Sequence, residues 1–496
     1  MSGKLSRTDY QLIDFSDPKS LFAHAKKLEG HTFQEVLDAG IAPETSSDDK
    51  DYVPTEYKGG MGNLVEERWF GYKANSNAEA DFPEAGIELK TTCYDMNAKG
   101  EIRAGERLVL GMIAYDESIE TELEESHMWD KSNTILLIYY SRDKEIERLE
   151  QTIGHVALFT PPEEDMAIIR EDYKTIQKLV VEGRADELSE SLTHYLGACT
   201  KGANSVKGNR DQSVYAPGKS ARSRAWCFKQ SYMNSILNDY IIGNGGGDAI
   251  IKDIEQLKGK SFEECIVSLL EPYIGMADVE IAEKLNLKTG PKNKSFWKMI
   301  AFRLLGLDSE RASEFEKANI KARTVRIEKN ASVKESFPLP TFKFADLAAE
   351  DEWEDSELYS YFDETRYFLT VFESDGDVYR LKGARFWSMP AEDINGPLHD
   401  CWLATRDKVR NGVTFTKRMQ KNKVTTISND LPGMSDNPIA HVRPHTSKSA
   451  YKLADGTGRG DIDKHGDRLP DGQWMTKQSF WLNNTYILGI VKNLLE

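Results

Sequence analysis

Asp81-Phe82-Pro83-Glu84-Ala85-Gly86-Ile87-Glu88-Leu89-Lys90 is the stretch that decides the fold of the first half of the chain. Apolar and polar residues alternate after Gly86, which predicts a strand over residues 87–92. Side chains two residues apart in a strand share a face, so Glu88 and Lys90 should point one way and Leu89 into the core. The proline and glycine before the strand permit a bend that returns Asp81 towards it.

Two carboxylates and a lysine in this pattern suit the hydrolysis of a phosphodiester bond. Asp81, Glu88 and the carbonyl oxygen of Leu89 would form an oxygen-rich site of the kind that the hard cation Mg²⁺ prefers. The cation would neutralise a phosphate and lower the pKa of a bound water. Lys90 would orient that water or stabilise charge that develops on the phosphate. The same spacing also occurs in solvated strands without function, so the rest of the sequence has to support it.

The charge of the chain is unevenly distributed. A net charge of −17 over 496 residues should repel a polyanion. Residues 200–230, however, hold seven Lys or Arg and one acid, and residues 406–423 hold seven and one again. Because screening limits the reach of distant charges to about 10 Å, both stretches could bind phosphates, although solvated loops would have the same composition.

Targeting signals and cofactor motifs are missing from the sequence. No apolar run approaches the ~20 residues of a membrane helix, and the first 14 residues lack the apolar core of a signal peptide. The five cysteines form no CxxC pair, and neither a P-loop nor a GxGxxG motif is present. We therefore expect a reduced, cytoplasmic protein.

Three short sequence motifs, called words below, recur in the same order on either side of the glycine-rich linker at residues 243–248. They predict two tandem copies of one fold, a domain over 1–243 and another over 248–496. The paired words are Leu28-Glu29-Gly30 with Leu257-Lys258-Gly259, Trp69-Phe70-Gly71 with Leu304-Leu305-Gly306, and Lys229-Gln230-Ser231-Tyr232 with Lys477-Gln478-Ser479-Phe480. The last pair is expected to open a helix in each copy.

The periodicity of each copy indicates a mixed α/β fold, with a central sheet flanked by helices. In copy one we expect helices at 19–37, 62–70, 164–181 and 186–195, strands at 87–92, 107–115, 134–140 and 155–160, and a strand–helix pair over 225–242. In copy two we expect strands at 367–373 and 379–386.

The Asp81–Lys90 segment resembles the catalytic motif of the PD-(D/E)xK nucleases, and residues 81–92 are most similar to the MutH endonucleases. Glu67-Arg68-Trp69-Phe70-Gly71 resembles the E-x-x-x-G helix of that family, which implies a third active-site carboxylate at Glu67 and a surface position for Glu66. His441-Val442-Arg443-Pro444 resembles a strand near the family's DNA-reading parts. Words spread over nearly the full chain resemble tandem MutH-like restriction enzymes. That resemblance implies a bacterial type II restriction endonuclease that uses Mg²⁺, recognises GATC in duplex DNA and cuts before the G.

Copy two lacks the catalytic acids when the two copies are aligned on a shared Phe-Pro. Ser336–Lys343 then takes the place of Asp81–Lys90, so that Lys343 alone survives and Phe302 replaces Glu67. Without carboxylates such a site cannot hold Mg²⁺. We therefore expect a catalytically degenerate copy that is kept for DNA binding or as an allosteric effector domain. One active site per chain would require a transient homodimer on DNA, or two successive nicks.

Several side chains are candidates for DNA contacts in addition to the catalytic residues. Basic stretches and the family resemblance suggest Lys201, Lys207, Arg210, Lys229, Arg443 and Lys477. His441 and His445 could form a metal pair, but Pro444 disfavours the helix that would align them. Two alternative functions remain: a MutH-like nicking enzyme of mismatch repair, and a GATC-binding regulator that does not cleave.

Overall fold

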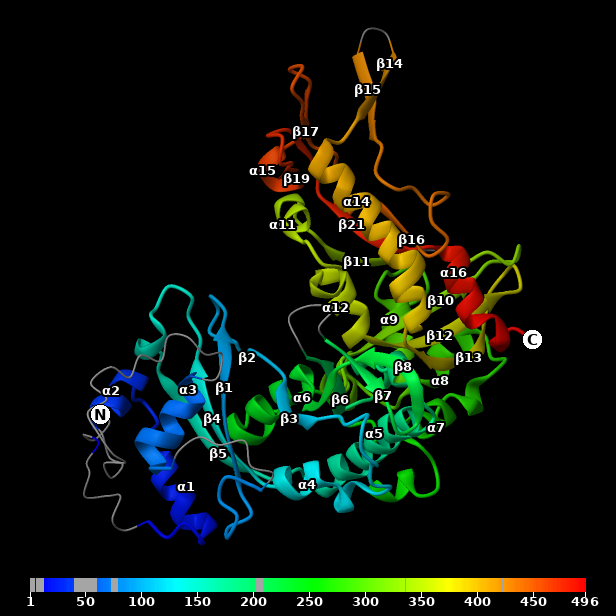
Figure 1. The fold of residues 1–496 in the computed structure, drawn as a ribbon. Coiled ribbons are helices and arrows are strands. Elements are labelled where there is room, and N and C mark those ends of the chain that lie inside the picture. Colours follow the sequence, from blue (N-terminus) through cyan, green and yellow to red (C-terminus); the bar gives the residue numbers. More distant parts are fainter. Residues whose placement is uncertain are drawn as a thin grey trace. The chain divides into compact units, whose positions relative to one another are not determined.

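The computed structural model describes residue 5 and residues 13–39, 60–72, 79–201, 208–334, 336–420 and 423–496. The chain forms two compact units, of which unit 1 comprises residues 1–247 with 253–255 and 313–318. Unit 2 comprises residues 248–252, 256–312 and 319–496. The main boundary therefore falls inside the glycine-rich linker, and one short helix from beyond it, α10 (Ser313–Lys317), packs with unit 1. Figure 1 labels most of the other elements of both units.

Unit 1 begins with helices rather than strands. These are α1 (Pro18–Lys26), α2 (Phe33–Ala39), α3 (Gly60–Val65) and the π-turn η2 (Glu66–Phe70). The single helix predicted over 19–37 is wrong, because the chain turns at Gly30, whose φ of +84° favours glycine. His31 then leads into a second helix, so the apolar faces of α1 and α2 can both reach the core that contains Leu21 and Phe33.

The central sheet of unit 1 has the strand order β2-β1-β4-β5. Strand β1 runs parallel to β4 and antiparallel to β2, and β4 runs antiparallel to β5. The first five residues of β4 are all buried, as expected for a strand covered on both faces. The strands are β1 (Glu88–Met96), β2 (Ile102–Ala104), β4 (Ile135–Ser141) and β5 (Ile153–Phe159), joined by η3 (Leu123–Glu125), α4 (His127–Ser132) and η4 (Arg148–Glu150).

A second sheet of unit 1 has the order β3-β9-β6 and follows the long helix α5 (Glu163–Val181). The helix predicted over 186–195 is wrong: two 3₁₀ turns, η5 (Ala185–Glu187) and η6 (Glu190–Leu192), stand there. The buried carboxylate of Asp172 accepts the backbone N–H groups of His194, Tyr195 and Leu196, which holds this segment extended. The other elements are β3 (Leu108–Met112), β6 (Leu196–Thr200), β7 (Asn209–Gln212), β8 (Ala216–Arg222), β9 (Arg224–Phe228), α6 (Gln230–Ser235) and the π-turn η7 (Ile236–Ile242).

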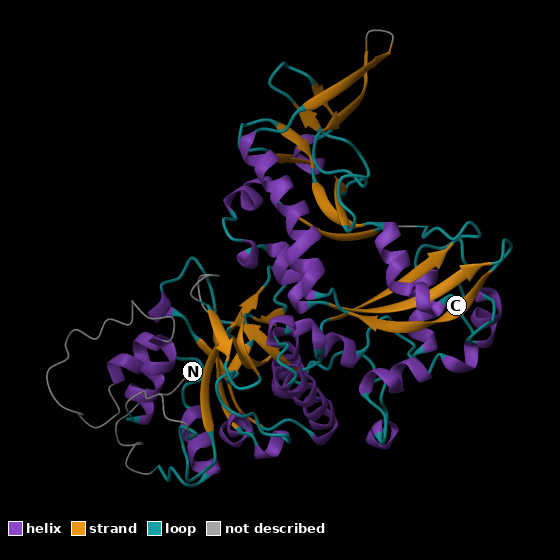
Figure 2. Ribbon diagram, turned by 45° about the vertical axis from the view of Figure 1, so that its right-hand side comes forward, coloured by secondary structure: helices purple, strands orange, loops and turns teal. Residues whose placement is uncertain are grey.

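Unit 2 contains a sheet β10-β12-β13 and a sheet β11-β21-β16, with helices beside both (Figure 2). Its helices and turns are η8 (Ile254–Leu257), α7 (Phe262–Ser268), η9 (Glu271–Tyr273), α8 (Asp278–Lys284), α9 (Phe296–Leu304), α11 (Phe344–Ala349), η10 (Trp353–Asp355), α12 (Glu357–Glu364), α13 (Ala391–Asp393), η11 (Ile394–Leu398), α14 (His399–Asn411), α15 (Ile462–His465), α16 (Asn484–Val491) and η12 (Lys492–Leu494). Its strands are β10 (Ile320–Ile327), β11 (Phe337–Thr341), β12 (Arg366–Ser374), β13 (Tyr379–Trp387), β14 (Phe415–Gln420), β15 (Lys423–Asn429), β16 (Ala440–Pro444), β17 (Tyr451–Lys452), β18 (Gly458–Arg459), β19 (Gly466–Arg468), β20 (Trp474–Thr476) and β21 (Gln478–Leu482).

The two units repeat the same strand connections, which confirms the predicted mixed α/β fold. Strand β10 is parallel to β12, and β12 is antiparallel to β13, as β1, β4 and β5 are in unit 1. Strands β11, β21 and β16 likewise repeat β3, β9 and β6. Even one buried contact recurs, because Tyr232 donates to Asp165 at 3.0 Å and Tyr486 donates to Asp393 at 2.6 Å.

These repeated contacts fix the register between the two units. Phe159 stands six residues before Asp165, and Trp387 stands six before Asp393. Phe159 is paired through β4 to Glu88, and Trp387 is paired through β12 to Lys321. Strand β10 is therefore the counterpart of β1, with Lys321 at the position of Glu88. By the same register Arg323 stands at the position of Lys90.

Two alignments made on sequence words are therefore wrong. Ser336–Lys343 does not match the catalytic segment, since β11 lies in the other sheet and is the counterpart of β3. Lys477 does not open a helix either, because it lies between strands β20 and β21. The counterpart of Lys229 is Asn483, since their backbone N–H groups donate to equivalent carbonyls, those of Tyr195 and Ile439. Short word matches mislead because strand position depends on pairing, not on local composition.

Candidate active site

A tight hairpin brings Asp81 beside the start of β1. Phe82 and Ile87 exchange two backbone hydrogen bonds, of 2.9 and 3.2 Å, and Gly86 between them has a φ of +64°. The returning chain lets the backbone N–H of Leu89 donate to Asp81 Oδ2 at 2.9 Å. The backbone N–H of Asp81 donates in turn to Glu88 Oε2 at 3.3 Å. The bend predicted from the proline and glycine thus places two carboxylates side by side.

Glu88 is the most buried member of the site, with 1% of its surface exposed. Its carboxylate forms an ion pair with Lys90, two residues along the same strand, as the strand alternation predicts. A second cation, Lys131 at the end of α4, lies 3.5 Å from Glu88 Oε1. Lys131 was not predicted from the sequence, because its nearness to Glu88 arises from the parallel pairing of β1 with β4 and leaves no local pattern.

The helix that precedes the site places Glu66 near its charged groups. Residues 66–70 form a π-turn, which closes where the N–H of Gly71 donates to the carbonyl of Glu66. Glu66 is half-buried, and its pKa is raised to about 7 by burial and then by repulsion from Asp81, partly offset by Lys90. Glu66 is therefore not fully exposed as the sequence predicted, while Glu67, which is also half-buried, stays a predicted site residue. A π-turn holds one residue more than an α-turn, which changes the residue that faces the strand.

Burial and mutual repulsion also affect other groups of the site. Burial raises the pKa of Asp81, and the neighbouring Glu88 raises it further. Burial likewise raises the pKa of Tyr72, with added repulsion from Asp81 and Glu66, so its hydroxyl stays protonated. That hydroxyl is buried and has no hydrogen-bond partner among the described residues. The site therefore concentrates negative charge and keeps one uncommitted donor close to it.

The donor set fits a hard divalent cation by its chemistry. Three carboxylates, those of Glu66, Asp81 and Glu88, repel one another at close range, and a cation would relieve that repulsion. As the side chains stand, no group of three His, Cys, Asp or Glu in the described part of the chain forms a ready metal cage. Lys90 and Lys131 hold Glu88 instead. Metal binding would thus require these carboxylates to exchange ammonium partners for the cation.

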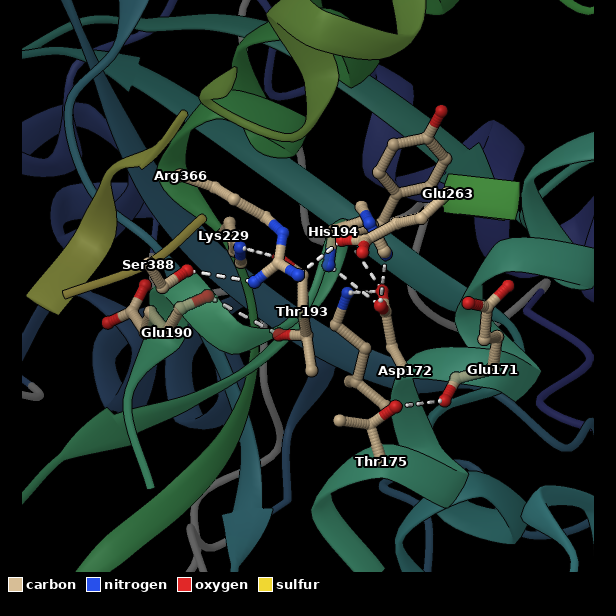
Figure 3. A network of polar contacts seen from close by, with 12 residues as sticks. Glu171, Asp172, Thr175, Glu190, Thr193, His194, Lys229, Glu263, Arg366 and Ser388 are labelled. Carbon is tan, nitrogen blue, oxygen red and sulfur yellow. Dashed lines mark hydrogen bonds and ion pairs between the residues drawn. The ribbon is translucent and has the colours of Figure 1, made fainter. Parts of the chain in front are cut away.

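Lys229, one of the predicted DNA contacts, is a structural residue. It is 2% exposed, and its ammonium donates to the carbonyl of Thr193 inside unit 1 (Figure 3). Burial leaves it no access to a phosphate, so this prediction is wrong. Its counterpart Asn483 makes the equivalent contact, with its side-chain amide donating to the carbonyl of Asn437 at 2.6 Å.

The other predicted DNA contacts stay predictions. Arg210 is exposed on the hairpin β7–β8, into which the described part of the basic loop folds. Lys201 and Lys477 are half-buried, and Lys477 donates to the carbonyl of Lys464 at 3.1 Å. Exposed Arg443 stacks on Trp481, with 4.4 Å between the guanidinium carbon and the ring centre. Lys207 lies outside the described residues.

The two histidines that Pro444 disfavours as a metal pair contact other polar groups. His441 is buried, with Nδ1 at 2.7 Å from Asn483 Oδ1, and His445 contacts Ser479 at 2.9 Å. Each ring is thus committed to a polar neighbour inside unit 2. In the described part of the chain, no helix is both long and apolar enough to span a bilayer.

Comparison with known proteins identifies relatives of the whole chain and of its first half. The family model of the DNA mismatch repair enzyme MutH matches residues 70–172, which include β1, β4, β5 and part of α5. The MutH protein of Shigella flexneri is 27% identical over 188 residues, covering 38% of this chain and 76% of that protein. The MutH protein of Pasteurella multocida is 24% identical over 230 residues, covering 46% and 97%.

One relative spans both units. The type II restriction enzyme Sau3AI of Staphylococcus aureus is 37% identical over 467 residues, covering 88% of this chain and 93% of that enzyme. The chain belongs to the Sau3AI family of type II restriction endonucleases, site-specific deoxyribonucleases whose first unit is MutH-like and metal-dependent.

Proposed function

We propose that this protein makes Mg²⁺-dependent double-strand breaks in DNA at GATC, and that the catalytic groups are Asp81, Glu88 and Lys90 of unit 1. The observation that carries this proposal is the buried Glu88, which lies beside Asp81 and forms an ion pair with Lys90 on one strand edge. A structural ion pair would not also require a hairpin that packs a second carboxylate against the first. Glu66 takes the role first assigned to Glu67.

Each residue then has a definite task. The carboxylates of Asp81, Glu88 and Glu66, together with the carbonyl oxygen of Leu89, would hold the cation, which would lower the pKa of a water and neutralise the scissile phosphate. Lys90, released from Glu88, would orient the attacking water and stabilise charge on the phosphate. Lys131 keeps part of the negative charge neutralised, since it is a second cation within 3.5 Å of Glu88. Tyr72 supplies a protonated hydroxyl beside the acids.

Among its described residues, unit 2 has no acid at the positions of Glu88 and Glu66. Lys321 and Arg323 stand where unit 1 has Glu88 and Lys90, and Phe302 in the last turn of α9 stands where unit 1 has Glu66 in η2. The equivalence of Phe302 and Glu66 rests on one backbone hydrogen bond at each helix end. The N–H of Leu307 donates to the carbonyl of Phe302, and the N–H of Tyr72 donates to the carbonyl of Glu66. We infer that residues 1–243 cut, that residues 248–496 bind DNA, and that two chains meet on a palindromic site.

Incubation of the purified chain with a supercoiled plasmid tests this proposal. With Mg²⁺, linear fragments that end at GATC are expected, while Ca²⁺ or a chelator should give none. Nicked circles alone would favour the MutH-like alternative, and unchanged plasmid that still shifts in a gel would favour a non-cleaving regulator. A plasmid whose GATC sites have been removed controls for sequence specificity.

A further inference from the structure

A basic cavity of about 530 Å³ lies in unit 2 between α9 and β10. These elements are the counterparts of η2 and β1, which carry the candidate active site in unit 1. Arg323, at the position of Lys90, lines this cavity together with Ala322 and Thr324, at the positions of Leu89 and Thr91. The cavity thus lies between the counterparts of η2 and β1, beside the position of Glu88, because Lys321 at that position is not part of the lining.

The side chains that line this cavity carry the charge opposite to that of the carboxylates in the unit 1 site. The described lining includes five cations and no carboxylate: Lys292, Lys294, Lys298, Arg323 and Arg326. Lys298 forms an ion pair with Glu310, with 2.9 Å between Nζ and Oε2, whereas neither Lys292 nor Lys294 has an ion-pair partner within the described part of unit 2. Cations gathered in a concave site raise the local potential and attract anions.

Trp297 organises the wall of the cavity. The guanidinium of Arg326 lies over its ring at 4.9 Å, and its backbone carbonyl accepts from Thr324 at 2.8 Å. The Nε1 of Trp297 is buried and has no acceptor among the described residues. A rigid aromatic wall with fixed cations is a preorganised anion site, because the guanidinium is held before the ligand arrives.

We propose that this cavity binds a backbone phosphate of duplex DNA, with Lys292, Lys294, Arg323 and Arg326 replacing the metal ion that neutralises a phosphate in unit 1. The assignment rests on the proposed function, since it takes DNA as the ligand of both units. Copies of one fold present the same edge to a ligand, so a duplex docked on unit 2 would bring a phosphate to the counterpart of the cleavage position. Because the lining of the cavity has no carboxylate that could hold a metal ion, the bound phosphate would not be hydrolysed.

The salt dependence of DNA binding tests the cavity directly. In the full chain, without divalent metal, Kd for a GATC duplex would be measured by fluorescence anisotropy at several salt concentrations. We compare Lys292→Gln/Lys294→Gln/Arg323→Gln with Lys260→Gln/Lys284→Gln/Lys492→Gln, which removes three exposed cations of unit 2 that do not line the cavity. The cavity variant should bind more weakly, and the slope of log Kd against log salt should fall by about 0.9 for each phosphate that the protein no longer neutralises.

Equal slopes in the two triple variants would overturn the proposal. Arg323 is half-buried, so its substitution could disturb folding. The double variant Lys292→Gln/Lys294→Gln changes only exposed side chains and controls for this. It should still show part of the change in slope. In a second arm, inorganic phosphate at constant ionic strength is added while thermal unfolding is followed. Suppose that phosphate raises the Tm of the control variant but not that of the cavity variant, and that the two variants have equal salt slopes for DNA binding. Free phosphate would then be the ligand, and the DNA assignment would be refuted.

Failure of this proposal can be told apart from failure of the proposed function. The cavity variant keeps every acid of unit 1, so at saturating protein it should still cut with Mg²⁺. A wild-type chain that never cuts would refute the proposed function, yet a slope change in the cavity variant would still establish the phosphate site.

Discussion

The strand edges formed by β1 in unit 1 and β10 in unit 2 have the same pairing and opposite charge. At equivalent positions, unit 1 has Glu88 and Lys90, while unit 2 has Lys321 and Arg323. In unit 1 the positive charge of Lys90 compensates a buried carboxylate, whereas in unit 2 Arg323 lines a cavity together with further cations. A fold that keeps its hydrogen-bond register can therefore reverse the electrostatics of one site while the core around it persists.

Glu88→Ala and Lys90→Ala should have the largest effect on this comparison. Each removes a group that acts on the transition state, so we expect the single-turnover cleavage rate to fall by about 100-fold or more, with GATC binding changed only a few-fold. Quenched-flow or gel assays on a one-site plasmid measure the rate. Glu84→Gln, an exposed carboxylate of the same hairpin, is the matched control. Normal cutting by either alanine variant would refute the active site.

Glu66→Gln and Glu67→Gln separate two adjacent carboxylates. Because Glu66 faces Asp81 across the site, its neutral variant should lower the cleavage rate at limiting Mg²⁺ by roughly 10- to 100-fold, within the range for loss of one charged group. The Glu67 variant should stay within a few-fold of wild type. The reverse ranking would restore the family-based assignment and show that the π-turn does not select the ligand.

The pH dependence of metal binding should distinguish the acidic edge from the basic one. With a pKa of about 7, Glu66 is largely protonated below that pH in the metal-free protein and cannot act as a ligand. Metal affinity should therefore fall by up to tenfold per pH unit as pH drops below about 7, and level off above it. Titration of Mn²⁺ or Mg²⁺ by calorimetry measures this, and Glu66→Gln should flatten the profile.

The same pKa shift predicts how unfolding responds to pH. Since the folded-state pKa of Glu66 is raised above its ordinary value of 4.5, its contribution to stability is fully present below pH 4.5 and is lost as pH rises through about 7. A bound metal ion opposes this loss, so Mg²⁺ should raise Tm more at pH 8 than at pH 6. An increase in Tm that is independent of pH would contradict the link between Glu66 and the metal.

The smallest expected effect concerns the tyrosine that both units share. Tyr232→Phe and Tyr486→Phe each remove one hydrogen bond to an aspartate, worth about 1 kcal/mol of unfolding free energy. Asp165 also accepts from Tyr240 and Lys317, whereas Tyr486 is the one hydrogen-bond donor described for Asp393. Urea unfolding should therefore show a small loss for Tyr232→Phe and a somewhat larger one for Tyr486→Phe, with cleavage unchanged. A large loss of cleavage in Tyr232→Phe would contradict a purely structural role.

Much of the site could be predicted from local sequence because a strand has a period of two. The alternation at Ile87–Lys90 placed Glu88 and Lys90 on one face, and the proline and glycine before it predicted the hairpin that returns Asp81. The strands of the central sheet were also found near their predicted positions, since apolar and β-branched runs report burial directly. The tandem repeat was visible because similar words recur in order around a linker.

Other features depended on pairing between distant segments. Lys131 approaches Glu88 because β4 pairs in parallel with β1, and no local pattern carries that information. Our proposal of Glu66 in place of Glu67 also depends on the fold, because one extra residue in a turn rotates the helix surface by about 100° per residue. The burial of Lys229, a basic residue in a basic stretch, follows from its contact with Thr193.

The sequence by itself determined the local strand that carries Glu88 and Lys90, the hairpin before it, and the presence of two copies. The tertiary structure alone decided which residues of the two copies are equivalent, because sheet register is set by hydrogen bonds to neighbouring strands and not by word matches. It moved the counterpart of β1 from Ser336–Lys343 to β10, and so disclosed a basic cavity at that edge of unit 2. Side-chain periodicity is local, whereas electrostatic surroundings are assembled from segments far apart in the chain.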